Sequence, residues 1–112
     1  MSLFKLEYPW YYYEPEGVRV GKFQYKQYSK FISEICLFSI SREHRGKGHG
    51  KRMLSWACQE CTTPLILATV RRDNTYWVDT NIKLGFRIIH LLPRPTGDVY
   101  VFLKSKQFEW PR

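Results

Sequence analysis

The fold is decided by residues 31–61, FISEICLFSISREHRGKGHGKRMLSWACQEC. Residues 31–40 form a dense apolar run bounded by polar residues, which is typical of a buried central strand. Residues 50–60 repeat apolar side chains at three- and four-residue spacing, which predicts an amphipathic helix. Between the two lies a turn that carries glycine at alternate positions: Gly46, Gly48 and Gly50. The stretch therefore predicts a strand, a glycine turn and a helix in direct succession.

A further strand follows this helix and completes a βαβ unit. Thr62, Thr63 and Pro64 end the helix, and residues 65–70 form another short apolar run. A strand, a helix and a strand in this order pair their strands in parallel through a right-handed crossover. We therefore expect a parallel pair at the centre of the sheet.

The rest of the chain predicts antiparallel pairs on both sides of that unit. A strand at residues 6–13, a turn at 14–17 and a strand at 18–25 predict a first hairpin. Asn74 is a candidate N-cap and Gly85 a candidate C-cap of a second helix. Residues 86–92 and 99–103 predict a last hairpin. The fold class expected is α/β (α+β): one domain over residues 1–112, with a mixed, mostly antiparallel sheet and a central βαβ parallel pair flanked by helices.

Composition favours a soluble protein with an anionic partner. The 112 residues carry a net charge of +8, so a phosphorylated cofactor, a nucleic acid or an acidic protein surface is a candidate ligand. Cys58 and Cys61 form a single CxxC without a second pair of ligands, so we expect buried apolar side chains and no metal site. Neither a signal peptide nor an apolar run of bilayer length is present. We therefore expect a cytoplasmic protein without a membrane partner.

The glycine turn has the chemistry of a diphosphate site. Glycines let the backbone take positive φ and approach a ligand closely, and the free N–H groups at a helix N-terminus bind anions. Arg45, Lys47, Lys51 and Arg52 add positive charge. The spacing fits neither a Walker A loop, which ends in Gly-Lys-Ser/Thr, nor the G-x-G-x-x-G of a dinucleotide fold.

The spacing that does fit is R-x-x-G-x-G, carried by Arg45, Gly48 and Gly50. In this the sequence resembles the GNAT superfamily of N-acetyltransferases, whose acyl-CoA motif also lies between a central strand and a helix. The segment Leu84, Gly85, Phe86 matches a second element of that family, at the end of a later helix. The resemblance covers about residues 18–104.

The resemblance implies an acetyl-CoA-dependent N-acetyltransferase and a set of cofactor contacts. Backbone groups near Phe38 and Ile40 would pair with the pantetheine arm like an added strand, where the strands ending near Ile40 and Val70 diverge. Amides of the glycine turn would hold the pyrophosphate, and Asn74 matches an asparagine that contacts the cofactor in this family. The candidate cofactor-binding residues are Phe38, Ile40, Arg45, Gly46, Lys47, Gly48, His49, Gly50, Lys51 and Asn74.

Two residues are candidates for proton transfer. Acyl transfer from a thioester to an amine needs a base for the amine proton. Glu34 on the central strand corresponds to a glutamate of related enzymes. The alternative hypothesis is that Glu34 is a surface carboxylate at the start of the strand, without a catalytic role. The tyrosine that the family commonly uses as acid is replaced here by Asn81, so Tyr76, one turn earlier on the same helix, is the candidate acid, with Tyr100 as a second possibility.

The acceptor is expected to be a macromolecule. Only about seventeen residues precede Val18, too few for the strand and two helices that commonly line the acceptor site of the family, so an open site is expected. A protein or another macromolecular amine is therefore the expected acceptor, and a homodimer through the aromatic residues 8–13 is a candidate assembly. Alternative hypotheses are a nucleic-acid-binding module, a GNAT-like protein that modifies a nucleic-acid base, and a non-catalytic member that binds CoA.

Overall fold

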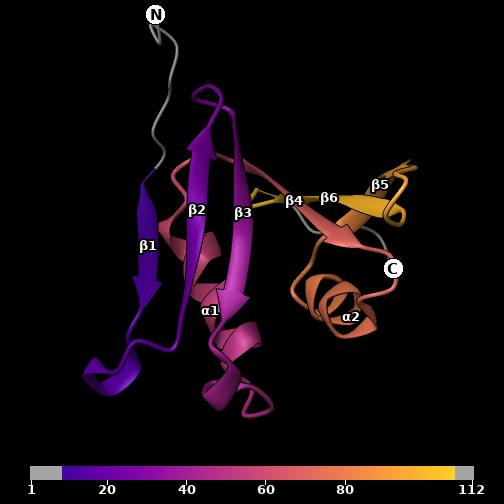
Figure 1. The fold of residues 1–112 in the computed structure, drawn as a ribbon. Helices are drawn as coiled ribbons and strands as arrows, with labels where there is room; N and C mark the ends of the chain where they lie inside the picture. The colour runs from indigo at the N-terminus through magenta and orange to yellow at the C-terminus, as the bar shows by residue number, and fades with distance from the viewer. Residues whose placement is uncertain (1–8, 108–112) are drawn as a thin grey trace, which may run out of the picture.

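The computed structural model describes residues 9–107 (Figure 1). Alternating apolar residues form the strands, and the two segments with helical periodicity form the helices, as the sequence patterns predict. The elements in chain order are β1 (Trp10–Tyr13), a 3-10 turn (Pro15–Gly17), β2 (Gly21–Gln27), β3 (Ile32–Ile40), a second 3-10 turn (Arg42–His44), α1 (His49–Glu60), β4 (Leu65–Arg71), α2 (Thr75–Lys83), β5 (Arg87–Leu92) and β6 (Val99–Ser105).

The strands form a six-stranded sheet in the order β1-β2-β3-β4-β6-β5. β3 and β4 pair in parallel, and every other neighbouring pair is antiparallel. The helix α1 connects the two parallel strands, as the βαβ prediction requires. The predicted fold class, a mixed and mostly antiparallel sheet around one parallel pair, is confirmed.

The helix α1 lies behind β2 and β3 in Figure 1, and α2 lies beside β4. The opposite face of β1–β3, turned toward the viewer, carries neither of these two helices. We call it the outer face; its exposed residues include Trp10, Tyr12, Lys22, Leu37 and Ser39. Within residues 9–107, no helix combines the length and the apolar character that crossing a bilayer requires.

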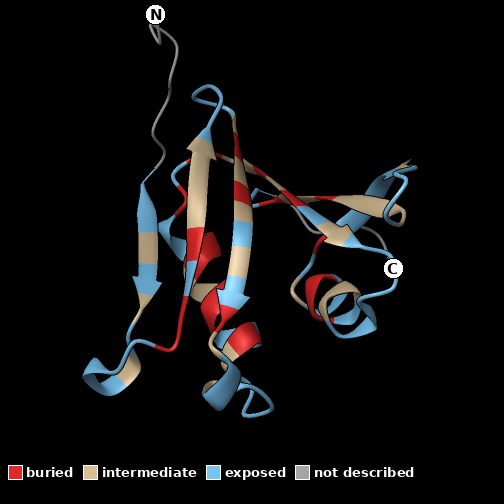
Figure 2. Cartoon of the chain, viewed as in Figure 1, coloured by how far each residue is buried: buried red, intermediate tan, exposed pale blue. Residues whose placement is uncertain are grey.

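The core lies between the sheet and α1 (Figure 2). Its largest fully buried apolar side chains come from four strands or strand starts and from α1: Phe23, Met53, Ile66, Phe86 and Phe102. Cys58 and Cys61 lie in the same core, and burial raises the pKa of the Cys58 thiol to about 11 and that of Cys61 to about 12. Both thiols are therefore protonated at neutral pH and act as small apolar groups, as predicted.

Element bounds differ from the prediction mainly at the first hairpin. The strand predicted at 18–25 runs over Gly21–Gln27. Val18 is exposed and caps the 3-10 turn, so the strand begins after it. Lys26 and Gln27 lie beyond the predicted end of that strand but are also paired, opposite Glu34 and Ser33. Residues 6–8 of the predicted first strand, including Tyr8, lie outside the described residues.

Candidate active site

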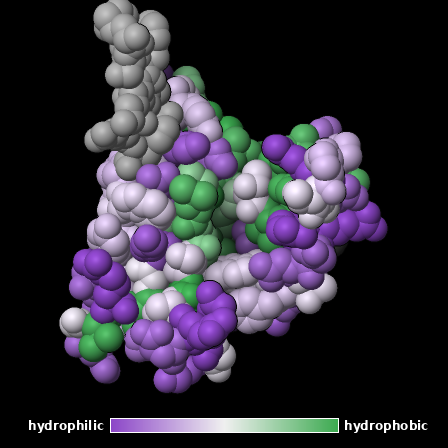
Figure 3. Space-filling view, viewed as in Figure 1, coloured by the Kyte–Doolittle hydropathy of each residue, from purple (hydrophilic) through white to green (hydrophobic). Residues whose placement is uncertain are grey.

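The parallel pairing of β3 and β4 stops halfway along β3. The paired residues run from Ile32 opposite Leu65 to Ile35 opposite Ala68. Beyond that point β4 stays paired with β6, whereas β3 continues to Ile40 with β2 as its paired neighbour on the other side. The segment from Cys36 to Ile40 therefore presents a free backbone edge to the opening between the strands, as the family resemblance implied. Figure 3 shows a hollow with hydrophobic atoms at this place.

A β-bulge at Leu37 reshapes that free segment. Leu37 has a φ of 52°, and the register with β2 slips between Lys22 and Gln24. A bulge leaves its extra residue outside the regular pairing and re-aims the side chains that follow. Ser33 and Ile35 face the core before the bulge, and Ile40 faces it afterwards, while Leu37 is 62% exposed. Backbone groups at Leu37 are thereby available beside the opening.

The glycine turn joins the end of β3 to the N-terminus of α1. Gly46 and Gly48 both have a φ of 79°, a conformation that L side chains rarely adopt. Gly48 is the N-cap residue of α1 and has no side chain to cap the first turn, so that turn lacks a side-chain hydrogen bond at its N-terminus. N–H groups at the positive end of a helix dipole are of the kind that bind anions, so the turn is a candidate anion site.

Position 50 requires glycine for a different reason from the one predicted. Positive φ was expected at all three glycines, but Gly50 is helical and buried. A Cβ at this position would lie 2.8 Å from Cη2 of Trp77 and 3.4 Å from the hydroxyl oxygen of Tyr76. The expectation of positive φ at Gly50 is therefore wrong. The position requires glycine because α2 packs directly against the first turn of α1.

Basic side chains surround the turn and are held in place by backbone carbonyls. Nε of Arg45 donates to the Ile40 carbonyl at 2.9 Å, and a guanidinium nitrogen of Arg52 donates to the Lys47 carbonyl at 2.9 Å. Desolvation, followed by the charge of Arg52 and of other nearby basic groups, lowers the pKa of His49. His49 is therefore neutral at pH 7 in this structure, and the cations here are arginine and lysine.

The first turn of α2 forms the opposite side of the site. Asn74 caps this helix, since its side-chain oxygen accepts a hydrogen bond from the Trp77 N–H at 3.4 Å, as predicted. The Trp77 ring meets Phe38 edge to face, with 4.7 Å between ring centroids. This contact ties α2 to the free segment of β3.

These elements enclose a pocket of about 590 Å³, which we call the central pocket. The volume suits a bound small molecule. Two predicted residues, Lys47 and Lys51, have exposed side chains outside its lining. The lining residues are Phe38, Ser39, Ile40, His44, Arg45, Gly46, Gly48, His49, Gly50, Asn74, Tyr76 and Trp77.

Sequence reasoning did not assign Ser39, His44 or Trp77 to the pocket. Ser39 lies between the two predicted strand residues Phe38 and Ile40, so a backbone edge contact would have included it. Trp77 follows Asn74 by three residues, a spacing that places both on one helix face. The signals were therefore present in the sequence, and Trp77 is also half-buried against the core.

The two predicted proton-transfer residues lie apart from each other. Tyr76 lines the pocket near Gly50. Glu34 lies outside that lining, four residues before Phe38, which is roughly 13 Å along a strand. Its carboxylate accepts a hydrogen bond from the Tyr28 hydroxyl at 2.5 Å. Tyr100, the second candidate acid, packs against Phe102 in the sheet.

Asn81 is a residue of α2 and is buried, with 2% of its surface exposed. Its side-chain nitrogen donates to the Trp77 carbonyl at 2.8 Å. Its side-chain oxygen has no hydrogen-bond partner among the described residues. The position where the family commonly has tyrosine therefore holds a short, internal amide.

Comparison with known proteins gives a consistent family. The model of the acetyltransferase (GNAT) family matches residues 3–86. No curated protein sequence matches the chain significantly. Among solved structures, Ard1 from Thermoplasma volcanium is 25% identical, with 84% of this chain and 68% of that chain covered and a TM-score of 0.71.

Two further solved structures share the fold at lower identity. A GNAT family acetyltransferase from Elizabethkingia anophelis, with acetyl-CoA bound, is 12% identical and has a TM-score of 0.78. The match covers 86% of this chain and 74% of that chain. The ribosomal-protein-S18-alanine N-acetyltransferase from Escherichia coli is 14% identical, covers 88% and 68%, and has a TM-score of 0.74.

Proposed function

Because the chain belongs to the GNAT family of acetyltransferases, we propose that it transfers the acetyl group of acetyl-CoA to an amine of a macromolecule. Membership makes the chain an acetyltransferase with acetyl-CoA as the acyl donor. The observation that carries the proposal is the central pocket, which joins the anion site of the glycine turn to the free edge of β3.

Acetyl-CoA would contact both of these parts of the pocket. The N–H groups of the glycine turn and the first turn of α1 would hold the pyrophosphate, with Arg45 and the flanking lysines adding charge. The backbone edge at Phe38 and Ile40 would hydrogen-bond the amide groups of the pantetheine arm, as an added strand does, and the Ile40 carbonyl would share its acceptor capacity with Nε of Arg45. Asn74, which caps α2, would contact the donor from the other side.

In the reaction, the amine nitrogen forms a bond to the acetyl carbon and the carbon–sulfur bond breaks. A backbone N–H beside the bulge at Leu37 would stabilise the oxyanion. We propose that Glu34 accepts the amine proton, through water, since it stands on the same strand three residues before the bulge. Two roles fit the Tyr76 hydroxyl near Gly50: protonating the leaving thiolate, or donating to a phosphate oxygen.

The Tyr76→Phe variant separates these two roles. If Tyr76 is the acid, kcat falls and the Kd for acetyl-CoA is unchanged. If Tyr76 binds a phosphate, the Kd rises and kcat is retained at saturating donor. The Ile82→Ala variant, an exposed change on the same helix, serves as the control for general damage to α2.

A macromolecular acceptor is supported by the open outer face. Within residues 9–107, neither helix covers the side of β1–β3 next to the free segment of β3. A flat, exposed surface suits a large acceptor better than a small metabolite, which is commonly enclosed. One structural neighbour is an enzyme named for acetylating a ribosomal protein. A homodimer through the aromatic residues 8–13 stays a prediction.

Calorimetry with acetyl-CoA tests the donor half of the proposal. We expect saturable one-to-one binding, which Arg45→Ala weakens about tenfold through the loss of a charge-assisted contact. Lys83→Ala removes an exposed charge on α2 away from the pocket lining and should leave the affinity unchanged. Absence of binding by the wild-type chain at millimolar acetyl-CoA contradicts the proposal.

Release of free CoA thiol with candidate acceptors tests the transfer half. Mass spectrometry of protein and nucleic-acid fractions after incubation with labelled acetyl-CoA would identify the acceptor. A second candidate function, binding or modifying a nucleic acid, is favoured by the net charge of +8 and by an arrangement of side chains on the outer face.

A further inference from the structure

Four side chains on the outer face alternate between cation and aromatic ring. The guanidinium carbon of Arg19 lies 3.9 Å from the centre of the Tyr12 ring, and Nζ of Lys22 lies 4.5 Å from the centre of the Trp10 ring. Tyr12 is paired across the strands with Lys22. The order along the surface is therefore Arg19, Tyr12, Lys22, Trp10, which we call the aromatic–cation row.

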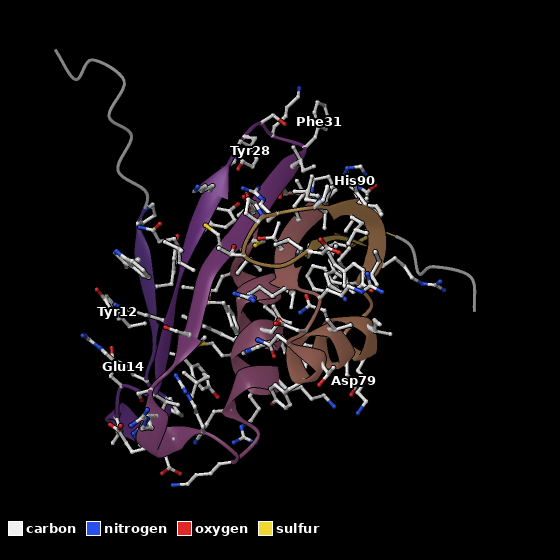
Figure 4. The ribbon with its side chains drawn as sticks, turned by 45° about the vertical axis from the view of Figure 1, so that its right-hand side comes forward. Tyr12, Glu14, Tyr28, Phe31, Asp79 and His90 are labelled. Atoms are coloured by element: carbon white, nitrogen blue, oxygen red, sulfur yellow. The ribbon has the colours of Figure 1, made fainter. Side chains whose placement is uncertain are left out.

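The row contributes to the surface rather than to the core. Tyr11 and Tyr13, the alternate residues of β1, pack against the buried cluster. Trp10 and Tyr12 instead keep 37% and 39% of their surface exposed, and both cations are exposed. Figure 4 shows Tyr12 projecting from β1 on the side away from the helices.

The row runs level with the free segment of β3. Trp10 is paired with Gln24, which is paired with Cys36, and Tyr12 is paired with Lys22, which is paired with Ser39. Two strand spacings, roughly 10 Å, separate Trp10 and Tyr12 from β3, and Lys22 lies one spacing from it. A molecule bound on the row therefore lies beside the stretch of β3 that borders the central pocket.

A second hollow of about 450 Å³ adjoins the row. Its lining includes Tyr12, Arg19 and Lys22 from the row. Ser39, Ile40 and Arg45 line both this hollow and the central pocket. Three cations and one carboxylate, Glu43, face the hollow, so an anionic ligand is favoured there: the lining residues are Tyr12, Arg19, Val20, Gly21, Lys22, Ser39, Ile40, Ser41, Glu43 and Arg45.

We propose that the aromatic–cation row is a docking surface for single-stranded nucleic acid. Proteins bind such strands by stacking bases on aromatic rings while neighbouring cations contact the phosphates, and the row supplies both groups in alternation. An acidic polypeptide would account for the cations, but its carboxylates offer no planar base to stack on the two exposed rings. The net charge of +8 adds a long-range attraction for a polyanion.

Fluorescence anisotropy of a fluorescein-labelled dT12 oligonucleotide tests the proposal. The wild-type chain should bind at low salt and lose affinity as salt rises. Trp10→Ala/Tyr12→Ala should weaken binding at least tenfold through the loss of base stacking. Arg19→Ala/Lys22→Ala should reduce the slope of log K against log salt by about 1.4, because each neutralised phosphate contributes about 0.7 for single strands.

Matched variants show whether the row itself is responsible. Lys83→Ala/Arg94→Ala removes the same charge from exposed positions outside the row and should keep most of the affinity. Trp10→Phe/Tyr12→Phe keeps the rings and should keep binding. The proposal is overturned if the row and control variants lose affinity equally, if the double alanine change at the rings has no effect, or if poly-glutamate competes as well as the oligonucleotide does.

The outcome is separate from that of acetyl transfer, because the oligonucleotide assay contains no donor. Calorimetry with acetyl-CoA on the same variants should show unchanged donor affinity, which also confirms that they are folded. If the wild-type chain binds acetyl-CoA but not the oligonucleotide, the docking surface alone is overturned. Absence of donor binding with intact oligonucleotide binding overturns the acetyltransferase proposal alone.

Discussion

The hydroxyl of Tyr28 donates a hydrogen bond of 2.5 Å to the carboxylate of Glu34. The two residues flank the turn between β2 and β3, and Figure 4 shows Tyr28 and Phe31 at the tip of that hairpin. This hydrogen bond restricts the rotamers of the Glu34 side chain. Tyr28 thus holds the Glu34 carboxylate in one orientation, as a positioned base requires.

Tyr28→Phe should lower kcat, because the Glu34 carboxylate loses the hydrogen bond that orients it. Glu34→Gln should lower kcat by about a hundredfold or more, with unchanged affinity for acetyl-CoA. Rates at saturating donor, measured with any amine that supports turnover, check both changes. Full activity of Glu34→Gln would show that another group or bulk water accepts the proton.

Gly50→Ala should weaken acetyl-CoA binding and destabilise the fold. Its Cβ would meet the Trp77 ring at 2.8 Å and force α2 away from α1, and such overpacking costs about 1–3 kcal/mol. Adding Trp77→Leu should restore part of the loss, which a double-mutant cycle of thermal unfolding measures. Gly17→Ala, at a φ of 80° with no atom within 4 Å of its Cβ, reports backbone strain alone.

Acetyl-CoA binding should take up a proton through His49 at a pH below about 6.5, the ordinary pKa of histidine. Desolvation and the neighbouring cations lower the pKa of His49 in the free protein, and bound phosphates would raise it again. Calorimetry in buffers of different ionisation enthalpy measures the uptake, and His49→Asn should abolish it. Without ligand, the lowered pKa means that His49 reduces stability as the pH falls through about 6.5, the ordinary value for histidine.

Asn81→Leu should change stability by less than about 1 kcal/mol. The substitution removes one hydrogen bond to the Trp77 carbonyl, but it also removes a buried oxygen that has no partner among the described residues. Thermal unfolding and kcat together check this expectation. A large fall in kcat with an unchanged midpoint would instead assign Asn81 to the chemistry, at the position where related enzymes have tyrosine.

Most of the fold could be predicted because its signals are local. The apolar run of β3, the periodicity of α1 and the glycine spacing each specify one element, and the order of elements then fixes the parallel pair. The family model and the sheet order confirm this part. The turn of residues 45–50 was found in the same way, because glycine and arginine carry the motif in the sequence itself.

The missed features depend on contacts between distant segments. A leucine at positive φ has no sequence signature, so the bulge at Leu37 could not be predicted, although it re-aims the end of β3. Gly50 and Trp77 meet in the fold but are 27 positions apart in the sequence. From its local sequence alone, Gly50 resembles a flexible glycine of a turn. The hydrogen bond between Tyr28 and Glu34 likewise depends on the shape of the β2–β3 turn.

The free edge of β3 also bears on the lifetime of the protein. An unpaired strand edge inside a molecule is a template for unwanted association with another chain, and natural proteins usually cover or distort such edges. The bulge distorts one end of this segment, and a bound donor would occupy the rest. Because a ligand that binds the native state alone stabilises it by mass action, acetyl-CoA would act as a folding ligand. The supply of donor would then set how much of the protein survives aggregation and proteolysis, in addition to how fast it works.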